Sequence, residues 1–211
     1  MWIFDIIQLA IILAVSIGMH EYAHAYVSYR LGDPTPKIQG RLTPNPLKHL
    51  DPLGFLMIFL IHFGRGKPVQ INPLYYKRPL RGELLVSIAW PITNLILALI
   101  GIIIILSYSK VIGIPFTDIF LNNVDLMTLF WIQFSFINIA LAIFNLIPVY
   151  PLDGYRFVKI LRKPLSDRME AYPLYSMIGL VIVLYVGSWV IGTVATFIFN
   201  VFFTLLGQLF Y

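Results

Sequence analysis

The chain contains 211 residues, of which 59% are apolar and only 12% are charged. A soluble globular domain has about 45–50% apolar and about 25% charged residues, so this composition excludes a disordered chain, a nucleic-acid-binding arm and an ordinary cytosolic enzyme. The mean hydropathy of +0.82 indicates an integral membrane protein. In such a protein the net charge of +5 reports on topology rather than on an acidic or nucleic-acid partner. The chain has no cysteine, which excludes disulfides, thiolate zinc ligands and a thiol nucleophile.

The first half of the chain holds one clear membrane span and a long polar segment. A spanning helix needs about 20 mostly apolar residues, and residues 3–30 meet this requirement before Gly32 and Pro34 end the helix. Residues 31–82 are polar and rich in turn residues, with a β-hairpin predicted around Gly40 and another short strand near 69–71. Within this segment, residues 52–63 are apolar but too short to span, which favours a re-entrant or interfacial segment.

The second half holds two further core spans and a long apolar C-terminal stretch. The core spans are predicted at residues 83–106 and 126–147. Residues 173–210 are apolar for longer than one helix needs, so they form either two helices divided at Gly187-Ser188 or one long kinked helix. The predicted fold is thus an all-α polytopic membrane protein. It forms a single membrane-embedded domain over residues 1–211, with three core helices and one or two C-terminal helices.

The positive charges are distributed very unevenly along the chain. Residues 30–82 carry nine Lys and Arg, residues 150–172 carry five, and the loop between the second and third spans carries only Lys110. If residues 52–63 do not cross, 14 of the 15 cations lie on one side, which the positive-inside rule makes cytosolic. This pattern supports a re-entrant 52–63 and an integral protein of a prokaryotic plasma membrane.

Residues 20–24 form an H-E-x-x-H pattern inside the first predicted span. Residues i and i+4 share one face of a helix, so His20 and His24 can bind the same metal ion. A hydrolytic zinc site uses three protein ligands and leaves one position for water, and Glu21 lies where it can take a proton from that water. Ionisable groups inside a span cost about 2.5–3.5 kcal/mol each and are functional by default. We therefore predict one Zn²⁺ per chain rather than structural, buried histidines.

A third ligand must come from elsewhere in the chain. His49 and His62 both lie in the 31–82 segment without a supporting pattern. Asp153 follows the third span after two prolines, and irregular backbone at membrane depth is tolerated only where it lines protein or a water cavity. His20 lies about 25 Å along the first span and the third span is about 33 Å long, so both segments reach the same depth near the cytosolic side. An ordinary Asp-Gly turn is the alternative reading of Asp153.

Three motifs together resemble the site-2 protease family of intramembrane zinc metalloproteases. They are His20-Glu21-x-x-His24, Pro91-x-x-Asn94 and Asn145-x-x-Pro148-x-x-Pro151-Leu152-Asp153-Gly154. The middle motif departs from the family pattern, because Trp90 stands where the family usually has glycine. The short loop after the second span and the chain end at Tyr211 leave no room for PDZ or CBS domains, which is similar to a compact branch of the family.

The resemblance implies that His20, His24 and Asp153 bind zinc and that Glu21 is the catalytic acid and base. It also implies that Asn94 and Asn145 hold the backbone of the substrate, a transmembrane helix of another protein that must unwind locally. The predicted strands offer an exposed edge to which the unwound substrate can add as a further β-strand. For Asn94, a helix–helix hydrogen bond is an equally weighted alternative. The expected partners are therefore a membrane-protein substrate and lipid, and the sequence leaves the oligomeric state open.

Other functions with the same ligands are less well supported by the sequence. A metal transporter would favour paired repeats with broken helices at the midplane, and the sequence shows no repeat. A proteolytically silent metal-binding relative would usually lack Glu21 or a ligand. A third ligand of the glutamate type would have to be Glu83 or Glu170, and neither lies in a comparable motif.

Overall fold

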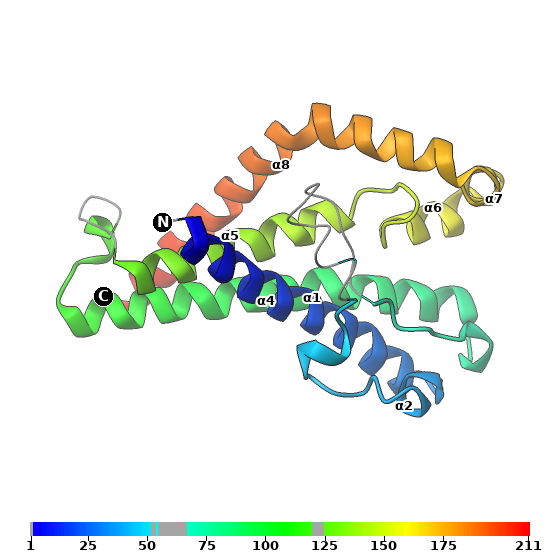
Figure 1. Cartoon of the computed structure of the whole chain (residues 1–211), viewed down its shortest axis with the longest axis horizontal. Helices are drawn as coiled ribbons and strands as arrows, with labels where there is room; N and C mark the ends of the chain where they lie inside the picture. Colours follow the sequence, from blue (N-terminus) through cyan, green and yellow to red (C-terminus); the bar gives the residue numbers. More distant parts are fainter. Residues whose placement is uncertain (1, 52–53, 55–66, 120–124) are drawn as a thin grey trace.

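The computed structural model describes residues 2–51, 54, 67–119 and 125–211. Within these residues, four helices are long and apolar enough to cross a membrane. They are α1 (Trp2–Arg30), α4 (Pro79–Ile112), α5 (Leu126–Asn145) and α8 (Pro173–Phe210). In Figure 1, α4 and α5 lie along the length of the molecule, with α1 crossing them on one side and α8 on another. The all-α polytopic fold is thereby confirmed.

Short helical elements connect the long helices. Between α1 and α4 lie α2 (Thr35–Ile38), η1 (Pro46–Lys48) and η2 (Pro73–Tyr75). Beyond α4 lie η3 (Phe116–Asp118), α6 (Tyr155–Leu161) and α7 (Lys163–Ala171). The residue before η1 and the residue before η2 are asparagines whose side chains accept a hydrogen bond from the backbone two residues on, so each short helix begins at a side-chain cap.

The predicted β-hairpin around Gly40 is wrong, and the described residues contain no strand. Two prolines at the start of α2 pre-set a helical turn, and Gly40 then ends that turn with a positive φ of 66°. The predicted strand at 69–71 is also absent. The amide of Val69, within this stretch, donates to the carboxylate of Glu21. The amide of Asn72, directly after it, donates to the carboxylate of Asp33, so neither amide pairs with a neighbouring strand.

The prediction that residues 52–63 re-enter the membrane, and the position of His62, lie outside the described residues. The described residues that flank this gap are joined directly, because the Lys67 N–H donates to the His49 carbonyl over 2.8 Å. The C-terminal stretch, by contrast, is settled as one helix. α8 continues through Gly187-Ser188 without a break and curves over the bundle in Figure 1.

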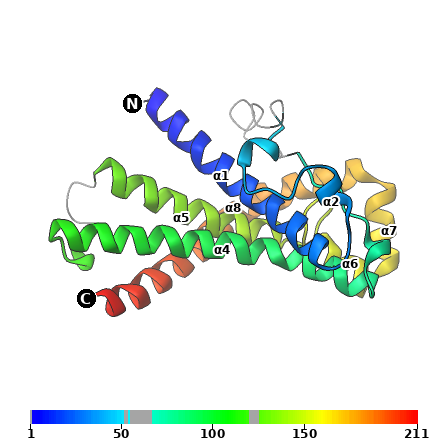
Figure 2. The same ribbon diagram turned by 90° about the horizontal axis from the view of Figure 1, so that it is seen from below.

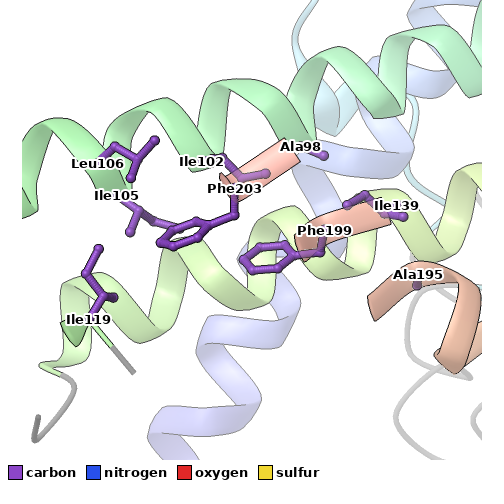
Figure 3. Packing of buried hydrophobic residues seen from close by; sticks show 9 residues of the cluster. All are labelled: Ala98, Ile102, Ile105, Leu106, Ile119, Ile139, Ala195, Phe199 and Phe203. Atoms are coloured by element: carbon purple, nitrogen blue, oxygen red, sulfur yellow. The ribbon is translucent and has the colours of Figure 1, made fainter. Parts of the chain in front are cut away.

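The apolar core lies between α4, α5 and the second half of α8. Figure 3 shows its nine buried residues, with Phe199 and Phe203 of α8 packing between the aliphatic side chains of α4 and Ile139 of α5. Moving a side chain of this size out of water into a protein interior stabilises the fold by about 1.5–3 kcal/mol. Between helices that are surrounded by lipid, close packing is the main source of stability instead. α1 contributes none of the nine. It is joined to α5 by a polar contact instead, in which Gln8 Nε2 donates to Gln133 Oε1 over 2.7 Å.

The two cation-rich segments lie at the same end of the helix bundle. In Figure 2, the C-terminal ends of α1 and α5 lie at the same end of the molecule as the first turns of α4 and α8. The described basic residues of the two cation-rich segments are at this end. At the opposite end the ammonium group of Lys110 donates to the backbone carbonyl of Phe210, which joins the last turns of α4 and α8.

A buried polar network fixes the loop that leaves α1. Asp33 is 0% exposed and accepts hydrogen bonds from the Ser28 hydroxyl, the Thr35 amide and the Asn72 amide, at 2.7–2.9 Å. Tyr76 adds its hydroxyl to that of Ser28. The network therefore ties residues 72–76 to the end of α1. Burial alone would raise the pKa of Asp33, but the hydrogen bonds from Thr35, Asn72 and Ser28 outweigh burial and lower it.

We expect Asp33→Asn to lower the free energy of unfolding by about 1–3 kcal/mol at neutral pH, because three donors lose a charged acceptor. Since the pKa of Asp33 is lower in the folded protein, Asp33 makes its full contribution to the free energy of unfolding above the pKa of the unfolded chain, near 3.8. This contribution declines as the pH falls from there through the pKa of the folded protein. Denaturant unfolding in detergent micelles at several pH values measures the difference. The control is Asp167→Asn at an exposed position on α7, and an Asp33→Asn protein as stable as that control would contradict the prediction.

Candidate metal centre

Two histidines on α1 face the same side of the helix. His20 and His24 are one turn apart, and their ring centroids are 4.7 Å apart in an edge-to-face arrangement. The helix continues unbroken from Trp2 to Arg30, so the i and i+4 spacing holds as the sequence predicts. Both imidazoles thus point toward the side of α1 that faces α4 and the loop after α5.

Asp153 joins the two histidines from a segment 129 positions away in the chain. Its Oδ2 lies 3.1 Å from His24 Nε2 and 3.6 Å from His20 Nε2. One ligand atom from each of the three residues lies within 4.8 Å of the others, so the group could hold a metal ion. The sequence argument from equal depth is therefore matched by the geometry.

The donor set suits zinc. His24 Nδ1 lies 3.0 Å from the Val86 carbonyl of α4, and because a carbonyl only accepts, Nδ1 carries a proton and Nε2 is the nitrogen that faces Asp153. His24 Nε2 and Asp153 Oδ2, 3.1 Å apart, can share either a proton on the imidazole or a metal ion bound by the neutral ring. A tetrahedral zinc bound at about 2.0–2.1 Å separates its ligand atoms by about 3.3 Å, which is close to the spacing observed. The Val86 carbonyl is the outer contact that ligating histidines usually make.

Glu21 lies beside this group but belongs to a different set of contacts. Its Oε1 is 3.6 Å from His20 Nε2, and its Oε2 accepts a hydrogen bond from the Val69 amide over 2.8 Å. The carboxylate is 8% exposed. One oxygen is thus held by the chain leading to α4, while the other faces the histidine.

The loop that carries Asp153 is braced from two directions. Arg156 Nε lies 3.9 Å from Asp153 Oδ1, and Lys159 on α6 donates to Glu83 on α4 over 3.2 Å. Burial alone would raise the pKa of Asp153, but His24, His20 and Arg156 together hold it well below its usual range. Asp153 is therefore an anion at neutral pH, as a metal ligand must be.

Gly154 allows the loop to turn back on the end of α5. Its N–H donates to the Asn145 carbonyl over 2.7 Å, and an added Cβ would overlap the backbone carbonyls of Leu146 and Ile147. Because the obstacle is backbone, it cannot move aside as a flexible side chain would. The residue after Asp153 therefore has to be glycine if the carboxylate is to keep its place.

We expect Gly154→Ala to weaken zinc binding by about 10–100-fold, since it displaces the adjacent ligand without removing it. Zinc titration of purified protein measures the change. The matched control is Gly179→Ala on α8, where an added Cβ would meet no atom within 4 Å. Equal zinc affinity in the two variants would show that the turn does not position Asp153.

The side chains of the other two predicted site residues make no hydrogen bond with the group among the described residues. Asn94 on α4 is 0% exposed, and its amide has no hydrogen-bond partner among the described residues. It lies one turn beyond Trp90, whose indole packs edge-to-face on His20 with centroids 4.3 Å apart. Asn145 ends α5, where its Nδ2 lies 3.4 Å from the Leu141 carbonyl.

Comparison with known proteins agrees with this geometry. The model of peptidase family M50 matches residues 107–186, which include the Asp153 loop. The Putative zinc metalloprotease YwhC of Bacillus subtilis (strain 168) is 46% identical over 156 residues, covering 74% of this chain and 69% of that protein. The chain belongs to peptidase family M50, the site-2 protease family.

Two further proteins are similar to this chain at lower identity. The Putative zinc metalloprotease Rip2 of Mycobacterium tuberculosis (strain H37Rv) is 27% identical over 190 residues, which cover 85% of this chain and 68% of that protein. The Zinc metalloprotease MJ0392 of Methanocaldococcus jannaschii is 27% identical over 171 residues, covering 81% of this chain and 39% of that protein. No solved structure gives a significant match. This M50 protein is thus a metalloprotease, and its four apolar helices indicate an integral membrane protein.

Several residues of the M50 site were not identified from the sequence. The Val86 carbonyl and the Val69 amide are backbone groups, which every non-proline residue has, so no motif marks them. The packing of Trp90 on His20 has a partial signal, because Trp90 directly precedes Pro91-x-x-Asn94. His49 was set aside for lack of a pattern, yet it is buried and close to His20.

Proposed function

We propose that this M50 protein is an intramembrane zinc metalloprotease that hydrolyses a peptide bond in or near a transmembrane segment of another membrane protein. The observation that carries the proposal is the convergence of His20, His24 and Asp153 from two distant segments, with the Glu21 carboxylate beside them. We assign the first three as ligands of one Zn²⁺ and Glu21 as the catalytic acid and base.

Each protein group has a separate task in this proposal. A zinc ion held by the three ligands supplies a Lewis acid that polarises the scissile carbonyl and lowers the pKa of a water molecule. Glu21 takes a proton from the attacking water at Oε1 and later delivers it to the leaving amine. The Val69 amide holds Oε2, so the carboxylate keeps one orientation through both transfers.

The substrate has to present an extended backbone at this site. A helix hides its peptide carbonyls in i to i−4 hydrogen bonds, so the segment must unwind before attack, and unwound backbone in lipid needs new partners. We assign Asn94 and Asn145 to this role. In support, both polar atoms of the Asn94 amide are buried without a partner among the described residues, and a partnerless buried amide is costly.

The cation-rich end of the bundle supports an active site near the cytosolic face of a prokaryotic plasma membrane. The ligand His20 lies ten residues before the end of α1, which corresponds to about 15 Å. That end carries the described basic residues that follow α1 and α5, and the positive-inside rule assigns such an end to the cytosol. Water would then reach the site by a short path.

The test is cleavage by purified protein that has been stripped of metal by a chelator. The probes are single-span membrane proteins in detergent micelles, with cut sites mapped by mass spectrometry. We expect no cleavage after stripping and recovery on adding about one equivalent of Zn²⁺ per chain. Zinc-independent cleavage, or zinc binding without any cleavage across the panel, would overturn the proposal and favour a silent metal-binding protein or a transporter.

A further inference from the structure

A third histidine lies close to the metal centre, and one of its ring nitrogens has no hydrogen-bond partner among the described residues. His49 follows η1 and is 0% exposed. Its Nε2 lies 2.8 Å from the Thr43 carbonyl, so Nε2 carries the proton and donates it. Burial and the neighbouring Arg41 lower the pKa of His49, against a smaller opposing effect of Thr43. The ring is therefore neutral, and its Nδ1 is a lone-pair acceptor.

The Nδ1 atom of His49 has no hydrogen-bond partner among the described residues. A buried acceptor left without a donor loses its hydrogen bonds to water without replacing them, so natural structures rarely keep one without a reason. The histidine is thus held in a fixed tautomer by Thr43 while its second nitrogen remains available. This is the state of a side chain that is prepared to accept a hydrogen bond from a ligand.

Two observations place the loop that carries His49 against the part of α1 that holds the metal centre. The loop that carries it packs closely on α1, because a Cβ added at Gly18, two residues before His20, would lie 2.6 Å from the Pro46 Cα. The imidazole of His49 is also within electrostatic range of His20. The same loop brings Arg41 within electrostatic range of Glu21. His49 nevertheless lies outside the compact group of three ligand atoms, so its role differs from metal ligation.

Several acceptors at the metal centre are already engaged. Asp153 Oδ2 lies between the two ligand histidines, and the Val86 carbonyl accepts from His24. One Glu21 oxygen accepts from Val69. An extended peptide brought to the metal centre carries backbone N–H groups that need an acceptor at this depth. The His49 Nδ1 is a neutral acceptor with no other use.

We propose that His49 is a substrate-binding residue whose Nδ1 accepts a hydrogen bond from a backbone N–H of the extended substrate beside the scissile bond. The inference rests on the proposed proteolytic function and names a group that recognises the unwound backbone. It also accounts for the Thr43 contact, which sets the tautomer. Trp90 provides the complementary group, since its buried indole N–H has no partner among the described residues and could serve a substrate carbonyl.

Two substitutions separate this role from a purely structural one. The terminal amide of glutamine overlays Nε2 of histidine, whereas the shorter amide of asparagine overlays Nδ1. His49→Gln can therefore keep the Thr43 contact and lose the Nδ1 acceptor, and His49→Asn does the reverse. We expect His49→Gln to bind zinc fully while kcat/KM falls about 10–100-fold, and His49→Asn to stay within about fivefold of wild type.

The opposite ranking, with an active Gln variant and an impaired Asn variant, would overturn the inference and leave only the Thr43 contact. Wild-type activity in both variants would overturn it as well, and so would loss of zinc from both. Failure of the wild-type protein to cleave any probe would instead refute the proposed function. Zinc content and thermal unfolding, recorded for each variant, show which of these outcomes applies.

A second measurement does not depend on how the variants fold. A cleaved single-span peptide is made as a series in which one amide N–H near the cut is replaced by an ester oxygen. With the wild-type protein, we expect one ester position to lower kcat/KM about 10–100-fold. With His49→Gln that ester should cause no further loss. If no position has an effect on the wild type, or if the two losses multiply, the hydrogen bond to His49 does not exist.

Discussion

Replacing Glu21 by Gln is expected to abolish peptide hydrolysis while leaving zinc bound. The amide is the same size as the carboxylate and can still contact the Val69 amide through its oxygen, so the local structure is retained. It cannot take a proton from water, and loss of a general base typically costs about 10²–10⁴-fold in rate. The measurements are zinc content by elemental analysis and cleavage of a mapped single-span substrate by the same preparation.

The control for this experiment is Glu170→Gln. Glu170 lies at an exposed position on α7, where its side chain accepts a hydrogen bond from Tyr155 that the oxygen of a glutamine amide can also accept. The Glu170→Gln variant should cleave the substrate at close to the wild-type rate and contain the same amount of zinc. Normal cleavage by Glu21→Gln would sink the catalytic assignment, whereas loss of zinc from that variant would show that Glu21 has a role in holding the metal.

Asp153→Ala is expected to lose the metal. Without its carboxylate, His20 and His24 are left as a two-ligand site, and hydrolytic zinc sites have three protein ligands. Zinc content should fall from about one per chain to near zero after dialysis, and cleavage should fall with it. A more conservative change, Asp153→Asn, keeps the shape of the turn and should still bind zinc far more weakly than wild type, because the neutral amide is a poor ligand.

Asp167→Ala, at an exposed position on α7, controls for the loss of an aspartate near the same end of the bundle. The two readings of Asp153 differ clearly in this experiment. An ordinary Asp-Gly turn predicts destabilised protein with full zinc occupancy in whatever remains folded. A metal ligand predicts folded protein without zinc, and thermal unfolding with elemental analysis distinguishes them.

The main parts of the site could be predicted because they depend on spacing along the chain. The pair His20 and His24 follows from the 3.6-residue period, and the arrival of Asp153 at the same depth follows from helix length. Both follow from counting residues along a helix. The contacts that complete the site involve the Val86 carbonyl and the Val69 amide, which depend on how α4 and its leading segment pack on α1. Periodicity carries no information about such contacts.

The errors in the fold prediction have similarly specific causes. The run around Gly40 has the residues of a hairpin, but Pro34 and Pro36 favour a helical turn there. The stretch near 69–71 is not helical, and the amides beside and within it bind buried carboxylates, which a strand prediction cannot anticipate. The C-terminal stretch is not one of these errors, since the sequence left one helix or two open. The stretch forms the single helix α8 through Gly187, because helix-breaking residues are better tolerated in an apolar setting where every backbone group must be paired within the helix.

The position of α1 outside the nine-residue apolar cluster has a consequence for how the molecule is held together. The nine residues join α4, α5, α8 and the loop after α4 into one body, whereas α1 packs beside this cluster with buried residues of its own, such as Ile12 and Ala25. Two of the proposed ligands lie on α1 and the third on the loop after α5. The ion would then act as a cross-link between α1 and the rest of the bundle. Metal binding would stabilise the assembly by a free energy that rises with the logarithm of its affinity, so hydrogen exchange along α1 should report the metal content of the enzyme independently of catalysis.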